Sequence, residues 1–310
     1  MKNISLKFYN MWGGFFEHDN IITNTLRKEY DVTITDSNPD IVICQVSPAS
    51  HQAPPPERFT SGFASSKIVH WLVESIDRTG DPDYSKCDFS ISSCKFEDDR
   101  NVRIPLWAMY VNWFGDQQES YVEGRNQAFL LSAKKLTNQV NVSQKSKFCS
   151  ILTNNDMGYR KEAYPKFINF GIDNGLLVES RGRAFTNMPS IGGDEKHKLE
   201  YLSDFKFNLC FDNGESDGWI TEKIIHPKYV GSIPIYWGCK DVAEEFNEEA
   251  FLHVRNFENL EHLHEKVLEL CYNTIEYKKI QTLPCFPDNK IPECVNQEFL
   301  LEQLKGIVEA

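Results

Sequence analysis

Short runs rich in Val, Ile and Phe alternate with amphipathic helical patterns along most of this 310-residue chain. A run of four to eight such residues predicts a buried strand, and apolar residues three or four positions apart predict a helix. We expect strands over residues 4–10, 32–35, 41–44, 68–73 and 89–92, and then over 148–152, 176–179, 205–211 and 233–236. Helices are expected over 127–136, 160–172, 195–202 and 222–229. Strands and helices that take turns in this way form parallel sheets covered by helices.

The polar segment 138–147 divides these patterns into two blocks. It is rich in Asn, Ser, Gln and Lys, and 41% of the whole chain is apolar, which is enough to fill two cores. We therefore predict an α/β fold of two doubly wound, Rossmann-like domains, residues 1–145 and 146–310, that face each other across a cleft. For the last helix, over 297–310, packing against the first domain is left open. In such sheets ligands bind beyond the carboxyl ends of the strands.

The charge and the cysteines limit the partners and the location. A net charge of -12 argues against a nucleic-acid partner, because such binding depends on Lys and Arg that neutralise phosphates. Nine cysteines without a CxxC pair indicate free thiols in a reducing compartment. No apolar stretch of 18 residues occurs and the N-terminus lacks a signal-peptide pattern. We expect a soluble, cytoplasmic protein, and leave open its oligomeric state and a peripheral contact at the inner membrane face.

Three motifs follow one another in the segment 205–238. They read Phe207-Asn208-Leu209-Cys210-Phe211-Asp212-Asn213, Trp219-Ile220-Thr221-Glu222-Lys223 and Ser232-Ile233-Pro234-Ile235-Tyr236-Trp237-Gly238. Their order and spacing resemble the donor-binding signature of the α-1,3/4-fucosyltransferases, glycosyltransferase family 10, and the bacterial members look nearest. The resemblance is strong over residues 147–257 and weaker over 1–110.

This resemblance implies a GT-B fold with an N-terminal acceptor domain and a C-terminal domain that binds GDP-fucose. It implies an inverting transfer of L-fucose to a sugar hydroxyl, which we place at O3 of a GlcNAc or Glc unit, in α linkage, in glycan biosynthesis such as that of lipopolysaccharide or in protein glycosylation. No essential metal or other cofactor is expected, because cationic side chains would take the place of a divalent ion at the pyrophosphate. The acidic triplet 97–99 is interpreted as solvated surface.

Arg160 and Lys223 are the expected diphosphate contacts. Each lies at the start of a predicted helix, where a cation gains nothing from the helix dipole, so a bound anion better explains its position. Residues 180–183, Ser-Arg-Gly-Arg, follow a strand and would offer backbone N–H groups to a phosphate. A single glycine there is weak evidence.

Glu222 has two explanations, since an acid in the first helical turn is favourable for the helix alone. By the resemblance it contacts the donor sugar and stabilises positive charge as the glycosidic bond breaks. Asp212, Asn213, Thr221 and Trp219 complete the implied donor site, with ribose or sugar hydroxyls as their partners and the indole as a flat apolar face. Asp212 stands where the family has Glu and Trp219 where it has Tyr, so the hydrogen bonds to the donor are expected to differ.

Inversion by direct displacement needs a general base on the acceptor side of the cleft. Glu74 is the candidate, because it follows an apolar strand at its carboxyl end, where partial burial would raise its pKa, and because it matches the family's base. Asp88 and Asp83 are the alternatives. The loop at Trp12-Gly13-Gly14, directly after the first strand, is expected to line the cleft and contact the acceptor.

Two other functions stay open at this point. One is the transfer of a different sugar from GDP or another nucleotide, which the departures at Asp212 and Trp219 motivate. The other is a non-catalytic protein that binds a nucleotide or a sugar, in which we would expect the loss of Glu74 or of the pair Arg160 and Lys223. All three are present and favour an enzyme, an alpha-1,3-fucosyltransferase.

Overall fold

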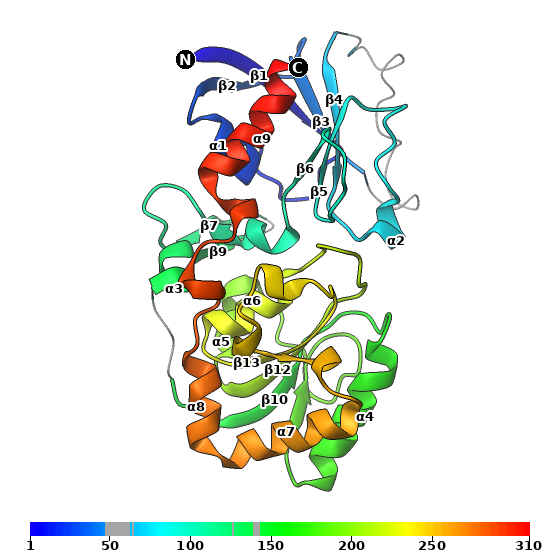
Figure 1. Ribbon diagram of the computed structural model, residues 1–310, viewed down its shortest axis with the longest axis vertical. Coiled ribbons are helices and arrows are strands. Elements are labelled where there is room, and N and C mark those ends of the chain that lie inside the picture. Colours follow the sequence, from blue (N-terminus) through cyan, green and yellow to red (C-terminus); the bar gives the residue numbers. More distant parts are fainter. Residues whose placement is uncertain (47–62, 64, 126, 139–142) are drawn as a thin grey trace.

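The computed structural model describes residues 1–46, 63, 65–125, 127–138 and 143–310. Figure 1 shows two lobes stacked along the long axis of the molecule, each built around a parallel sheet. The α/β class predicted from the sequence is confirmed.

The first lobe contains a six-stranded sheet in the order β2-β1-β3-β4-β5-β6, in which all neighbouring strands are parallel. The central strands β3 and β4 are almost completely buried, as expected for strands with helices or loops on both faces. The strands are β1 (Lys2–Tyr9), β2 (Tyr30–Ile34), β3 (Ile41–Gln45), β4 (Lys67–Leu72), β5 (Phe89–Ser92) and β6 (Asn101–Arg103), with helices α1 (Ile21–Leu26) and α2 (Ile76–Thr79).

The second lobe contains a five-stranded parallel sheet in the order β11-β10-β12-β13-β14. Its strands are β10 (Lys147–Ile151), β11 (Val178–Ser180), β12 (Phe205–Phe211), β13 (Ile233–Trp237) and β14 (Leu252–His253). Its helices are α4 (Arg160–Asp173), α5 (Glu195–Leu202), α6 (Glu222–Tyr229), α7 (Leu260–Tyr272) and α8 (Thr274–Thr282).

A small three-stranded sheet lies between these two parts of the chain, and here one prediction is wrong. The helix expected over 127–136 begins only at residue 133, because residues 129–132 form a strand. A short apolar run fits either structure, and pairing with two neighbouring strands decides for the strand. The elements are β7 (Val111–Asn112), β8 (Ser120–Tyr121), β9 (Phe129–Ser132) and α3 (Ala133–Asn138).

The C-terminal helix α9 (Gln297–Glu309) returns to the first lobe and lies beside α1, as the red and blue ribbons show (Figure 1). Lys305 forms an ion pair with Glu29 at 3.1 Å. The ammonium group of Lys67 donates to the carbonyl groups of Ile307 and Val308 at 3.0 and 2.8 Å, and so satisfies acceptors in the last turn of α9.

The largest apolar cluster crosses the junction between the lobes. It joins Trp107 and Trp113, from the segment after β6, to Ile224 of α6 and to Phe246 and Phe286 farther along the chain. Trp107 is completely buried, and its ring centroid lies 5.1 Å from that of Phe246. The lobes therefore share a hydrophobic core on one side, while the second lobe has a separate cluster around β10, β12 and α4.

Candidate active site

The carboxyl ends of strands β4 and β5 meet the loop between β12 and α6 of the other lobe. The indole N–H of Trp219 donates to the Val73 carbonyl oxygen at 3.3 Å, one residue before Glu74. The backbone N–H of Lys95 donates to the Asp217 carbonyl oxygen at 2.9 Å. The strand ends at which ligands bind in such sheets therefore come together at this junction.

A cavity of about 470 Å³ opens beside this junction in the second lobe. It lies between the loop after β10, the loop after β11 and the first turns of α5 and α6. Five cationic and three anionic side chains line it, which is an excess of positive charge in a chain whose net charge is -12. The cations are Arg160, Arg181, Arg183, Lys198 and Lys223, and the anions are Asp194, Glu195 and Glu222. Such a cavity suits a ligand with several negative charges.

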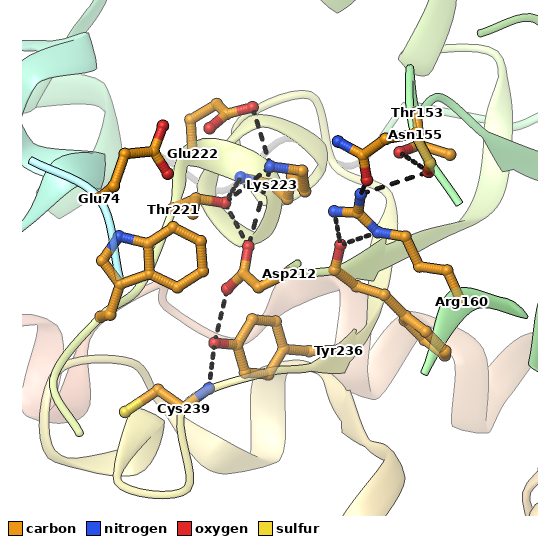
Figure 2. Close-up of polar contacts among 12 residues, drawn as sticks. Glu74, Thr153, Asn155, Arg160, Asp212, Thr221, Glu222, Lys223, Tyr236 and Cys239 are labelled. Carbon is orange, nitrogen blue, oxygen red and sulfur yellow. Dashed lines mark hydrogen bonds and ion pairs between the residues drawn. The ribbon is translucent and has the colours of Figure 1, made fainter. Parts of the chain in front are cut away.

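Arg160, the first residue of α4, connects two of the loops around the cavity. Its side chain is 1% exposed, and its Nε and Nη2 atoms donate to the Phe211 carbonyl oxygen at 3.0 and 2.5 Å. Its Nη1 atom donates to Oδ1 of Asn155 at 2.5 Å. The guanidinium group is thus held against the end of β12 and against the loop after β10, as Figure 2 shows.

The start of α6 is organised around a buried carboxylate. Asp212 is 0% exposed; its Oδ1 atom accepts a hydrogen bond from Thr221, and its Oδ2 atom accepts one from the Tyr236 hydroxyl at 2.9 Å. The ammonium group of Lys223 lies 3.9 Å from Oδ1 of Asp212 and 3.1 Å from the Thr221 hydroxyl (Figure 2). Burial raises the pKa of Asp212, although the charge of Lys223 and the Thr221 hydrogen bond oppose this. The buried Asp212 carboxyl group therefore holds the side chains of Thr221 and Lys223 in position at the start of α6.

Glu222 lies at the cavity wall between two ammonium groups. Its Oε1 atom is 3.0 Å from Nζ of Lys198 and 3.6 Å from Nζ of Lys223. Burial opposes ionisation, but the two lysine charges outweigh it and hold the pKa of Glu222 well below its usual range. The carboxyl group is therefore held as an anion between the two ammonium groups.

The other site candidates are distributed over three places. Asn213 lines the cavity, whereas Trp219 is 1% exposed and lies in the junction between the lobes, so its ring does not form a wall of the cavity. The side chain of Glu74 is 35% exposed and forms an ion pair with Arg78 at 3.3 Å, instead of the apolar surroundings expected from the strand before it. The structure thus brings Lys223, Glu222, Asn213 and Arg160 together and leaves Trp219 outside that group.

Asp88 and Asp83, the alternatives to Glu74 as the general base, both form contacts that stabilise the local structure. Oδ2 of Asp88 accepts a hydrogen bond from the backbone N–H of Ile68 at 2.8 Å. Asp83 accepts hydrogen bonds from Ser85, forms an ion pair with Lys86 at 2.8 Å, and these contacts lower its pKa to about 2. Within the described residues, no cluster of three or more His, Cys, Asp or Glu side chains is arranged to hold a metal ion.

Three residues of the site were not predicted. Lys198 lies on α5, outside the motif segment; Tyr236 looked like an ordinary residue of an apolar strand. Tyr110, in the 3-10 helix η1 (Leu106–Tyr110), belongs to the first lobe, and its ring packs edge-on against His226 of α6 at 5.3 Å. Burial raises the pKa of Tyr110 well above its usual value. The negative charges of Glu222, Glu195 and Glu74 act in the same direction. Tyr110 therefore places a side chain of the first lobe against α6, the helix that begins with Glu222.

The weak signal at residues 180–183 proves informative, because Arg181, Gly182 and Arg183 all line the cavity. Gly182 is required by space: a Cβ atom there would lie 1.8 Å from the Thr153 carbonyl oxygen. The close approach of these two backbones forms one wall of the cavity.

A second, more open groove of about 570 Å³ lies in the first lobe. The loop after β1 lines it, with Trp12, Phe15, Phe16 and Glu17 among its residues. The ring of Trp12 packs against Trp71 of β4, with centroids 5.5 Å apart, so the groove belongs to the same edge of the sheet as the end of β4.

Comparison with known proteins agrees with this geometry. Residues 136–281 match the family model described as glycosyltransferase family 10 (fucosyltransferase) C-term. Residues 136–281, a little under half of the chain, are therefore similar to the C-terminal part of that family. Over 72 residues it is 46% identical to an alpha-(1,3)-fucosyltransferase of Helicobacter pylori, an alignment that spans 23% of this chain and 15% of that relative. The matched stretches span between 15% and 28% of the lengths of the curated relatives.

Solved structures extend the likeness to the whole fold. A crystal structure of an alpha1,3-fucosyltransferase superposes with a TM-score of 0.74 at 21% identity, over 100% of this chain and 91% of the other. An alpha1,3-fucosyltransferase with GDP-fucose superposes with a TM-score of 0.70 at 20% identity, over 100% and 92%. The predicted GT-B fold is thereby confirmed. None of the helices in the described ranges has the length and hydrophobicity that crossing a membrane requires.

Proposed function

We propose that this protein transfers L-fucose from GDP-fucose to O3 of a GlcNAc or Glc unit of a glycan, with inversion to the α linkage. The observation that carries the proposal is the positively charged cavity at the start of α6, where Lys223 and Glu222 lie side by side. Support comes from the family match over residues 136–281 and from the relative whose structure contains GDP-fucose. The second domain, 146–310, would bind the donor, and the first, 1–145, the acceptor.

The chemistry needs a leaving group stabilised on one side and a base on the other. As the acceptor hydroxyl oxygen bonds to C1 of fucose, its proton passes to Glu74, and the C1–O bond breaks with its electrons retained by GDP. Lys223 and the N-terminal N–H groups of α6 stabilise the charge that develops on the diphosphate. Glu222 offers a negative charge to the oxocarbenium-like sugar. These residues use no divalent ion, so we expect turnover in the presence of a chelator.

The groove lined by Trp12 and Phe15 is our candidate for the acceptor, because aromatic rings pack well against the apolar faces of sugars. All nine cysteines are free thiols, which suits a cytoplasmic reaction in the assembly of a surface glycan such as lipopolysaccharide. Arg78 would have to release Glu74, or share it, when the acceptor hydroxyl arrives.

Calorimetric titration with GDP, GDP-fucose, GDP-mannose and UDP-sugars, without metal, tests the donor. We expect GDP and GDP-fucose to bind, and Lys223→Ala to weaken both about 10- to 100-fold, the usual worth of a hydrogen bond to a charged group. Lys166→Ala removes a half-exposed ammonium group on α4 and should leave both affinities unchanged. A lack of preference for guanine would overturn the fucosyltransferase proposal, and preference for GDP-mannose would identify a transferase of a different sugar.

A second experiment separates catalysis from binding alone. Glu74→Gln should keep the affinity for GDP-fucose and lower transfer at least 100-fold, because the proton of the acceptor hydroxyl has lost its base. Transfer at the wild-type rate would exclude Glu74 as the base, and no transfer by the wild type to any GlcNAc or Glc acceptor would favour a binding protein.

A further inference from the structure

Lys198 and Lys223 hold Glu222 in the cavity where the proposed donor's diphosphate would bind. Both ammonium groups line this cavity, and their side chains are only 21% and 23% exposed. Glu222 itself is 14% exposed, and its Oε1 atom contacts both ammonium groups. An ion pair that points into a charged cavity differs from a surface ion pair, because a ligand can compete for either partner.

Among the described residues, Lys198 and Lys223 form ion pairs with Glu222 and Asp212, whereas Glu195, which also lines the cavity, lies beyond ion-pair distance. Asp212 lies 3.9 Å from Lys223, farther than Glu222, and its oxygen atoms already accept hydrogen bonds from Thr221 and Tyr236. His226, one turn along α6 from Glu222, is completely buried and its imidazole nitrogens have no partner within the described residues. Glu222 is therefore the principal counter-ion of the pair.

We propose that Lys198 is a second diphosphate-binding residue, and that Glu222 occupies both ammonium groups until a diphosphate displaces it. Binding of the donor then transfers Lys198 and Lys223 to the phosphate oxygens and frees the Glu222 carboxylate to turn toward the sugar. This inference rests on the proposed function for the identity of the donor, but the exchange of partners requires only a diphosphate.

If the partners exchange in this way, removal of Lys198 and removal of the Glu222 charge should change the affinity for GDP in opposite directions. Lys198→Met removes a cation and should weaken GDP binding about tenfold. Glu222→Gln removes the competing anion but keeps the shape of the side chain, and should tighten GDP binding about threefold to fivefold while it lowers fucosyl transfer. In the Lys198→Met background the gain from Glu222→Gln should shrink, because one of the two shared ammonium groups is gone.

The experiment is calorimetric titration of the full chain with inorganic pyrophosphate, with GDP and with UDP. Lys196→Met is the matched control, because Lys196 lies on the same helix with an exposed side chain, and its affinities should equal those of the wild type. Lys198→Arg keeps the charge and should retain most of the affinity, which separates loss of charge from loss of folding.

Each outcome decides one point. Unchanged pyrophosphate affinity in Lys198→Met overturns the role of Lys198, and equal or weaker affinity in Glu222→Gln overturns the exchange of partners. Pyrophosphate binding that follows the expected pattern without preference for GDP over UDP keeps this inference and overturns the proposed donor. A wild-type protein that binds neither pyrophosphate nor GDP overturns both.

Discussion

Replacing Tyr236 with Phe should destabilise the second domain more than an ordinary loss of one hydroxyl. The Tyr236 hydroxyl donates to Asp212 at 2.9 Å and accepts from the backbone N–H of Cys239 at 3.0 Å, and all three residues are 0% exposed. In Tyr236→Phe, water cannot replace either partner. A lost hydrogen bond to a charged group costs about 1.5–3 kcal/mol and an unsatisfied buried N–H about 1–3 kcal/mol. Because the two losses are not independent, we expect a total of about 3 kcal/mol.

Urea unfolding followed by circular dichroism measures this cost, and a loss of about 3 kcal/mol should lower the urea midpoint by roughly 1 M. The matched control is Tyr277→Phe, since the Tyr277 hydroxyl is in the same domain and donates only to the Lys206 carbonyl oxygen at 3.1 Å. We expect the control to lose about 1 kcal/mol. Equal losses in the two variants would refute the reasoning that Asp212 depends on Tyr236.

Two further predictions concern the cavity wall and the response to acid. Gly182→Ala should weaken GDP binding at least about tenfold in calorimetry, because its Cβ atom would lie 1.8 Å from the Thr153 carbonyl oxygen and must push the two loops apart. Gly306→Ala is the control, because its Cβ atom meets no neighbouring atom, and it should bind GDP like the wild type. Burial lowers the pKa of His70 from 6.5 to about 4. The unfolded chain therefore binds this proton more tightly than the folded protein does. As the pH falls from 6.5 to 4, the free energy of unfolding should decrease by up to about 3 kcal/mol. His70→Leu should remove this part of the acid sensitivity in urea unfolding at pH 7 and pH 4, and parallel losses in both proteins would contradict it.

Much of the fold could be predicted because its strands are apolar runs of ordinary length. The strand expected over 205–211 is observed as β12, and the helix expected over 195–202 as α5. The helix predicted over 127–136 is wrong for residues 129–132, since their apolar side chains suit a helix and a strand equally and pairing with β7 and β8 decides. Short strands such as β14 owe their existence to a neighbour in the sheet.

The candidate site was predictable where one segment of the chain supplies it. Lys223 and Glu222 adjoin in sequence and in space, so their motif located them directly. Lys198 could not be distinguished from Lys196, because only the packing of α5 decides which side chain faces the cavity. The contact of Trp219 with Val73 could not be predicted, since it depends on how the two lobes dock.

The contact between Trp219 and Val73 has a practical meaning for redesign of this protein. It joins the loop that follows β12 to the segment directly after β4, in which Glu74 lies. A library that varies position 219 to change the preference for the proposed donor also alters the support of Glu74, the proposed base. Residues 73–74 and 216–219 should therefore be varied as one unit, and each variant screened against donor and acceptor together.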